Sequence, residues 1–200
     1  LEAALARKRG EAKLLLTRDV QVSYDKVQVL FGVDIDIAAG EIVALLGTNG
    51  AGKSTLLKAI SGVTEADRGA IVLDGRDITH APPNEIAALG IAQLPGGHAI
   101  FPSLTVRENI EASQWLATQK KQSGTAEAEE SLQLFPEILE RWNEPAANLS
   151  GGQQQMLGLA MALHSAPKVL MIDELSLGLA PAVVERILPV IKQIAANGTA

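Results

Sequence analysis

The stretch GTNGAGKST, residues 47–55, combines glycines, a lysine and hydroxyl side chains at the spacing of a phosphate-binding loop. Gly47, Gly52, Lys53 and Ser54 match the pattern G-x-x-x-x-G-K-[ST]. Glycines let the backbone wrap closely around phosphates, a lysine reaches the β- and γ-phosphates, and a serine hydroxyl can ligate Mg²⁺. We therefore predict a nucleoside triphosphate site formed by Gly47, Thr48, Asn49, Gly50, Ala51, Gly52, Lys53, Ser54 and Thr55.

A second stretch, NLSGGQQQMLGLA at residues 148–160, places a hydroxyl and a pair of glycines before a helical run. Backbone N–H groups at the start of a helix, together with the positive end of the helix dipole, face whatever lies there. Ser150 and the glycines after it therefore suit a phosphate. The same residues also fit a capped helix start with a polar first turn, so the stretch alone leaves both interpretations open.

The third stretch is VLMIDE, residues 169–174, in which an apolar run ends on an acidic pair. Ligands of parallel sheets collect at the carboxyl ends of strands, which is where Asp173 is expected. There Asp173 would hold Mg²⁺, and Glu174 could accept a proton from an attacking water. An acidic pair after a strand can also simply cap a loop. Combined with the Lys53 loop, the pair predicts nucleotide hydrolysis.

Composition limits the classes of protein to which the chain can belong. It has 200 residues, of which 47% are hydrophobic and 20% charged, as in a globular domain. The net charge of -6 argues against nucleic acid as a partner, because a basic surface would be expected. The chain contains no cysteine and no apolar run long enough to span a bilayer, so a membrane role would require a partner or a further segment.

Hydrophobic periodicity predicts the elements that must position these residues. Alternating runs predict strands near the N-terminus, and continuous apolar runs predict buried strands before the glycine loop and before Asp173. We predict an α/β fold: a P-loop NTPase core with a parallel sheet, an N-terminal antiparallel β subdomain and an inserted helical subdomain. The predicted strands are 14–24, 33–37, 41–47, the hairpin 69–79 and 168–174, and the predicted helices are 53–62, 105–119, 126–142 and 181–197.

The predicted domain organisation is a polar tail or linker at 1–13 and one domain at 14–200, with the helical subdomain at about 97–160. The chain ends just after a helix, where an alternating fold would continue with a strand. We therefore expect the domain to be incomplete at its C-terminus.

The order GTNGAGKST, LSGGQQQ, VLMIDE resembles the nucleotide-binding domain of ATP-binding cassette (ABC) transporters, over about residues 14–200. FPSLTVREN (101–109) and SLGLAPAVVERI (176–187) are most similar to the ATPases of branched-chain amino acid importers. The resemblance implies ATP and Mg²⁺ as ligands, a head-to-tail pair of ABC ATPase domains, transmembrane permease domains as partners, and a place on the cytoplasmic face of the plasma membrane.

The resemblance also implies a role for individual residues. Lys53 and Glu174 would be catalytic, Ser54 and Asp173 would hold Mg²⁺, and Tyr24 would stack on adenine. As a lone aromatic residue, Tyr24 could equally be a core or edge residue. The γ-phosphate of ATP held by the partner domain would be covered by the signature Leu149, Ser150, Gly151, Gly152 and Gln153.

The sequence departs from the family pattern at two positions. Gly96 stands where the family has a glutamine or glutamate that contacts Mg²⁺ and the attacking water, and Leu175 replaces the usual proline. Gln93 is expected to belong to the preceding strand. We expect slowed hydrolysis, and we expect Gly96→Gln to raise turnover.

Two alternatives to an importer ATPase stay open: a non-transport soluble ABC ATPase, and a cassette that has lost hydrolysis and serves as a regulatory module. The histidines form no cluster in the sequence. His80 and His98 are expected in loops and His164 at the surface of a helix, so no metal site beyond Mg²⁺ is predicted.

Overall fold

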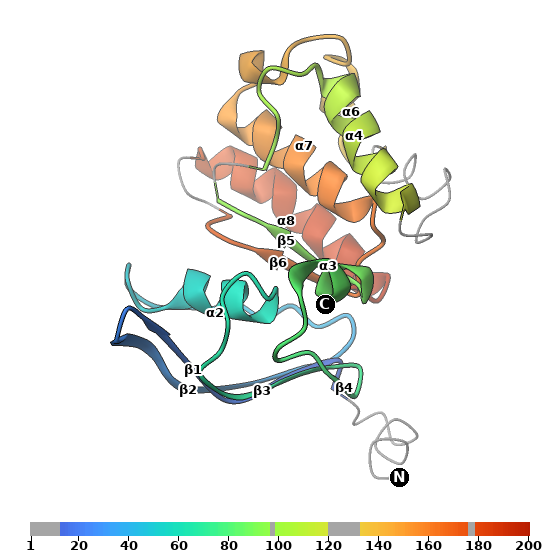
Figure 1. Cartoon of the computed structure of the whole chain (residues 1–200). Helices are drawn as coiled ribbons and strands as arrows, with labels where there is room; N and C mark the ends of the chain where they lie inside the picture. Colours follow the sequence, from blue (N-terminus) through green and yellow to red (C-terminus); the bar gives the residue numbers. More distant parts are fainter. Residues whose placement is uncertain (1–12, 97–98, 120–132, 176–178) are drawn as a thin grey trace. The chain divides into compact units, whose positions relative to one another are not determined.

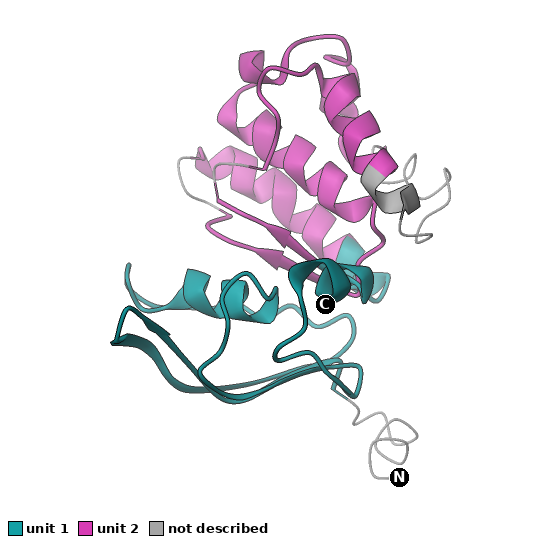
Figure 2. Ribbon diagram, in the orientation of Figure 1, with its two compact units in different colours: residues 1–91, 194–200 teal, residues 92–193 magenta. Residues whose placement is uncertain are grey.

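The chain folds into two units, each with its own sheet and helices (Figure 2). The computed structural model describes residues 13–96, 99–119, 133–175 and 179–200. The first unit is formed by Leu1–Ile91 with Ile194–Ala200, and the second by Ala92–Gln193. The predicted tail at 1–13 lies almost wholly outside the described residues, as do His98 and residues 126–132 of the helix predicted at 126–142. The described part of that prediction is wrong: over 133–142 the only continuous helix is the single turn Pro136–Leu139. Pro136 has no backbone N–H and disfavours helical conformation at the residue before it, so it interrupts the predicted helix.

An antiparallel sheet in the order β2-β1-β3-β4 forms the base of the first unit (Figure 1). The predicted N-terminal strands and the hairpin are confirmed. In the hairpin turn Asp74 and Gly75 both have positive φ, at 50° and 79°, which suits an Asp-Gly pair. The strands are β1 (Leu15–Tyr24), β2 (Val27–Ile37), β3 (Arg68–Leu73) and β4 (Arg76–Asp77).

A bulge in β1 changes which side chains face the core. Leu15 and Thr17 are buried before it, and Val20 and Val22 are buried after it, so the alternation shifts by one residue. Asp19, at the bulge, has a φ of 48° and its N–H donates to Asp34 Oδ1 at 2.6 Å.

Glycines stand on both neighbouring strands opposite the bulge. A Cβ on Gly32 of β2 would lie 2.5 Å from Asp19 Oδ1, and one on Gly69 of β3 would collide with the Asp19 carbonyl. Both glycines also have positive φ, at 92° and 95°. The bulge therefore requires residues without side chains on both sides.

Helix α2 (Lys53–Ile60) follows the glycine loop and buries Leu56, Leu57 and Ile60 in the first unit. Its predicted end at Gly62 is confirmed by a φ of 73° there. A Cβ on Gly62 would lie 2.7 Å from the Ile86 side chain of the short helix α3 (Pro83–Ala88), so this glycine also permits close packing.

The prediction of a buried strand at 41–47 is wrong. Residues 41–48 form no strand, and Ile42 and Leu46 are 54% and 92% exposed. A strand that is apolar on both faces is stable only between neighbouring strands and beneath covering elements. In the part of the chain that the structure describes, no strand pairs with this segment.

The second unit packs helices against the sheet formed by β5 and β6, which is parallel. Asp173 N–H donates to Leu94 O at 3.0 Å, which extends the pairing one residue beyond β6. Gln93 lies within β5, as predicted. The elements are β5 (Ile91–Leu94), α4 (Val106–Gln119), α6 (Pro136–Leu139), the 3₁₀ turn η1 (Ala146–Asn148), α7 (Gly151–Leu163), β6 (Val169–Ile172) and α8 (Pro181–Ala196), the last of which continues into the first unit.

Helix α7 packs closely against its neighbours through glycines. A Cβ on Gly158 would lie 2.8 Å from Ala99 Cβ and 2.9 Å from the Leu94 side chain. On another face, a Cβ on Gly152 would lie 2.6 Å from Val183 of α8. Buried residues of α7, including Leu157 and Leu159, belong to the hydrophobic core of this unit.

The prediction that His164 lies at the surface of a helix is also wrong. The residue is buried, with 1% of its surface exposed. Its ring Nδ1 lies 2.5 Å from Ser113 Oγ of α4, and Ser113 Oγ also donates to Ile110 O at 2.8 Å. The position at the end of α7 turns the imidazole toward α4, a contact that local sequence does not encode.

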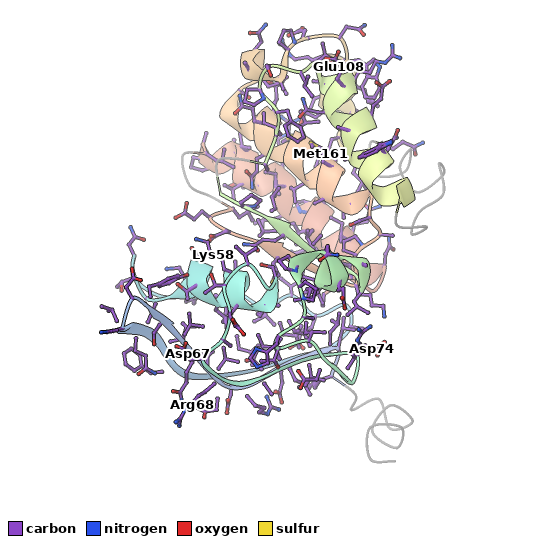
Figure 3. All side chains as sticks on the ribbon, in the orientation of Figure 1. Lys58, Asp67, Arg68, Asp74, Glu108 and Met161 are labelled. Atoms are coloured by element: carbon purple, nitrogen blue, oxygen red, sulfur yellow. The ribbon has the colours of Figure 1, made fainter. Side chains whose placement is uncertain are left out.

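Asn109 of α4 is fully buried and fixes the loop that precedes its helix. Its Oδ1 accepts from Phe101 N at 2.7 Å, and its amide nitrogen donates to Phe101 O at 3.0 Å and to Thr105 O at 2.9 Å. The helix start is closed by Glu108 (Figure 3), whose carboxylate accepts from Thr105 N–H at 2.8 Å. Loop and helix therefore form one rigid piece.

Asn109→Ala is expected to destabilise the domain by about 1–3 kcal/mol, because it leaves the partly buried N–H and C=O of Phe101 without their Asn109 partner. Asn143→Ala removes an exposed side chain of the same type and should change stability by less than about 0.5 kcal/mol. Chemical denaturation of both variants measures the difference. Equal stabilities would contradict the role of Asn109.

Candidate functional site

The glycine loop reaches helix α2 through residues in the left-handed region. Gly50 and Gly52 have φ of 85° and 89°, and a Cβ on Gly52 would lie 2.7 Å from the Leu30 side chain of β2. Gly50 has open space where a Cβ would lie. These positions therefore require glycine, one for conformation alone and the other for conformation and close packing.

The amides at the start of α2 are available to an anion. The first intrahelical hydrogen bond runs from Leu56 N–H to Gly52 O at 2.9 Å, so Lys53, Ser54 and Thr55 precede it. No acidic side chain lies in the first turn of the helix. Free N–H groups and the positive end of the dipole thus face the loop, as phosphate binding requires.

Lys53 folds back over its own loop. Its Nζ donates to Gly47 O at 2.8 Å and to Thr48 O at 2.9 Å. The ammonium group is therefore held at the loop by backbone carbonyls, beside the helix start that attracts anions. The structure brings together Gly47, Thr48 and Lys53 as the motif predicted.

Tyr24 ends β1 in the same unit, with 42% of its surface exposed. Its hydroxyl lies 3.3 Å from Thr64 Oγ1, beyond the end of α2, and this hydrogen bond lowers the pKa of the Tyr24 phenol. Sequence reasoning missed Thr64, because a lone threonine in a loop carries no signal. The Tyr24 side chain is thus held through its hydroxyl and partly exposed, which is compatible with stacking.

The signature lies at the start of α7, where two exposed residues stand between two buried ones. Leu149 and Gly152 are buried, whereas Ser150 and Gly151 are exposed. A capping box is present: Gln153 N–H donates to Ser150 Oγ at 3.3 Å, and Ser150 N–H donates to Gln153 Oε1 at 3.0 Å. The cap leaves the hydroxyl proton of Ser150 and the amides of both glycines available to a ligand.

The acidic pair lies at the carboxyl end of β6, as predicted. Asp173 continues the pairing with β5, and Glu174 is exposed with a φ of 54°. Non-glycine residues rarely adopt such a φ, and strained positions of this kind cluster at functional sites. Gly96 lies beside Glu174 in the same unit: a Cβ on Gly96 would lie 3.0 Å from Glu174 Oε2.

The available side chains fit Mg²⁺ rather than a softer metal. Ser54 in the first unit offers a hydroxyl, and Asp173 in the second unit offers a carboxylate. Each is an oxygen ligand of the kind that Mg²⁺ prefers, and this ion usually completes its shell with waters and substrate phosphates. Among the described residues, no group of three or more His, Cys, Asp or Glu side chains could hold a metal.

The sequence model of the ABC transporter family matches residues 30–176. The chain belongs to this family. It is an ABC-type ATPase domain with a P-loop NTPase core, and the predicted fold class is confirmed. In the described ranges, no helix combines the length and apolar character needed to cross a membrane.

Relatives of known name support this membership. The chain is 40% identical to the high-affinity branched-chain amino acid transport ATP-binding protein BraG of Pseudomonas aeruginosa, over 90% of this chain and 76% of that protein. It is 35% identical to the xylose/arabinose import ATP-binding protein XylG of Sulfolobus acidocaldarius, over 92% and 75%. The ADP conformation of an ATP-binding cassette of an ABC transporter matches with a TM-score of 0.81 at 27% identity, over 93% of this chain and 78% of that one.

Lys53→Ala is expected to weaken ATP binding about 100-fold or more, since charged hydrogen bonds to phosphates contribute about 1.5–3 kcal/mol each. Lys58→Ala, in the last turn of the same helix (Figure 3), removes an exposed charge and should change the affinity less than about two-fold. Titration with a fluorescent ATP analogue compares them. Unchanged affinity in Lys53→Ala would refute the nucleotide site.

Proposed function

We propose that this chain is the ATP-hydrolysing subunit of an importer for branched-chain amino acids. In this proposal, two copies of the domain pair head to tail and bind ATP with Mg²⁺ between them, at the cytoplasmic face of the membrane. Transmembrane permease domains move the solute. The observation that carries the proposal is the Lys53 loop, whose glycines, free amides and ammonium group form a triphosphate cradle at the start of α2.

The start of α7 supports a site shared between two copies. Ser150 and Gly151 are exposed, and α7 has no acidic side chain in its first turn. Buried Leu149 and Gly152 on either side fix the orientation of these groups. A phosphate presented by a second copy would meet a hydroxyl and N–H groups aimed outward from a rigid helix.

The acidic pair supports hydrolysis. Within the proposal, Asp173 and Ser54 hold Mg²⁺, which neutralises phosphate charge when bound. The exposed carboxylate of Glu174 accepts the proton of an attacking water. The backbone just before Glu174 is fixed, because Asp173 is still paired with β5.

The loop before α4 supports a docking role for the region about 97–160, which faces the permease in our proposal. The Phe101 side chain is 49% exposed, whereas its backbone N–H and C=O both form hydrogen bonds with the Asn109 side chain. An exposed aromatic side chain on a rigid loop is a suitable anchor for a partner.

The choice of amino acids as the solute rests on relatives. BraG and the probable branched-chain amino acid transport protein LivF of Archaeoglobus fulgidus are 40% and 39% identical to the chain, against 35% for XylG. A hydrolysis-impaired regulatory cassette is the second candidate, favoured by Gly96, which lacks the side chain that would help hold the attacking water.

Ser150→Asp separates the capping role of this residue from phosphate binding. Aspartate caps helices as well as serine does, so stability should change by less than about 0.5 kcal/mol. Its charge would repel the γ-phosphate, so ATP turnover by the full-length protein should fall at least about 100-fold. Ser165→Ala, at the other end of α7, is the control and should retain turnover. Normal turnover by Ser150→Asp would refute the shared site.

The solute is tested by uptake in cells that carry only the Lys53→Ala variant of this protein. Leucine and valine uptake should be lost, because ATP no longer energises the importer, while xylose uptake should be unchanged. Radiolabelled uptake over the first minute measures both. Loss of xylose uptake with normal leucine uptake would overturn the amino acid assignment and leave the ATPase assignment intact.

A further inference from the structure

Gly96 leaves space for the side chain of Glu174, because glycine has no Cβ. A Cβ on Gly96 would lie 3.0 Å from Glu174 Oε2, 3.3 Å from Glu174 Cβ and 3.5 Å from Asp173 O. The carboxylate could move away by rotation, but the Cβ of Glu174 is placed by its backbone. Even the smallest side chain at position 96 would therefore require the Cβ of Glu174 to shift by a few tenths of an ångström, whichever rotamer Glu174 adopts, and a larger side chain would require more.

The strand pairing brings these residues together. Asp173 N–H donates to Leu94 O at 3.0 Å, so the chain after β5 and the chain after β6 leave the sheet side by side. Gly96 is two residues after Leu94, and Glu174 is one residue after Asp173. Their proximity is thus a consequence of backbone pairing rather than of a flexible loop.

Backbone conformation does not explain a glycine at position 96. The φ of Gly96 lies outside the left-handed region, so alanine could adopt the same backbone. The required property is the missing side chain. Alanine at this position consequently tests steric exclusion without adding backbone strain.

Leu175 permits the conformation of Glu174. Glu174 has a φ of 54°, whereas a proline at position 175 would favour extended backbone with negative φ at the residue before it. The two departures from the family pattern, at positions 96 and 175, therefore both affect Glu174. One allows the backbone of Glu174 to turn, and the other leaves room for its side chain.

We infer that Gly96 is a positioning residue that sets the place of the Glu174 carboxylate during ATP hydrolysis. The inference rests on the proposed role of Glu174 as proton acceptor. It reverses the expectation from sequence for Gly96→Gln, because a glutamine at position 96 would compete with Glu174 for the same space. A displacement of about 1 Å in a catalytic group can cost about 100-fold in rate.

The test compares steady-state ATP hydrolysis by the full-length protein and its Gly96→Ala, Gly96→Gln and Glu174→Gln variants. We expect kcat to fall about 10-fold in Gly96→Ala and about 100-fold in Gly96→Gln, with the KM for ATP within about two-fold of wild type. Pro95→Ala is the control: it changes the exposed residue before Gly96 but adds no atoms beside Glu174, and it should keep kcat within about two-fold of wild type.

A double variant tests whether Gly96 acts through Glu174. Adding Gly96→Ala to Glu174→Gln should cause no further loss in the single-turnover rate, because the carboxylate is already gone. An equal loss in both backgrounds, an unchanged kcat in Gly96→Ala, or faster turnover by Gly96→Gln would each overturn the inference while sparing the proposed function. Normal turnover by Glu174→Gln would instead overturn the role of Glu174, and the inference with it.

Discussion

The close approach of α7 to its neighbours is the constraint on which the second unit depends. At Gly158 the helix lies so near β5 and the following loop that a single methyl group would touch Ala99 and Leu94. At Gly152 the same holds against Val183. Packing at this distance leaves few ways to place the helix, since protein interiors are filled at high density. This packing also fixes the position of the exposed start of α7, where Ser150 forms hydrogen bonds with Gln153 and Gln154 of its own helix.

The groups assigned to ATP share a structural property: they stand where regular elements begin or end. Lys53 opens α2, Ser150 precedes α7, and Asp173 follows β6. Backbone groups at such ends lack partners within their own element, so they are free for a ligand, while the body of the element holds them rigid. This placement explains why the site residues are scattered along the sequence yet each is locally well defined.

Much of this could be predicted from the sequence, because motifs and helix starts depend on neighbours a few residues away. The Lys53 loop, the strand before Asp173 and the Asp74–Gly75 turn are of this kind. The failures depend on distant contacts. Residues 41–47 carry the pattern of a buried strand, but pattern alone does not supply neighbouring strands. The burial of His164 follows from its packing on α4, and the contact between Gly96 and Glu174 follows from pairing between strands far apart in the chain.

The bulge in β1 has a consequence for folding. A strand that pairs one residue out of step turns every side chain to the opposite face of the sheet. Here a slip of one residue would place Phe31 or Val33, instead of Gly32, opposite the protruding Asp19, and Arg68 or Ala70 instead of Gly69. Each wrong alignment would press a Cβ into the bulge. The bulge and its two glycines therefore favour one alignment of the three strands over alignments shifted by one residue.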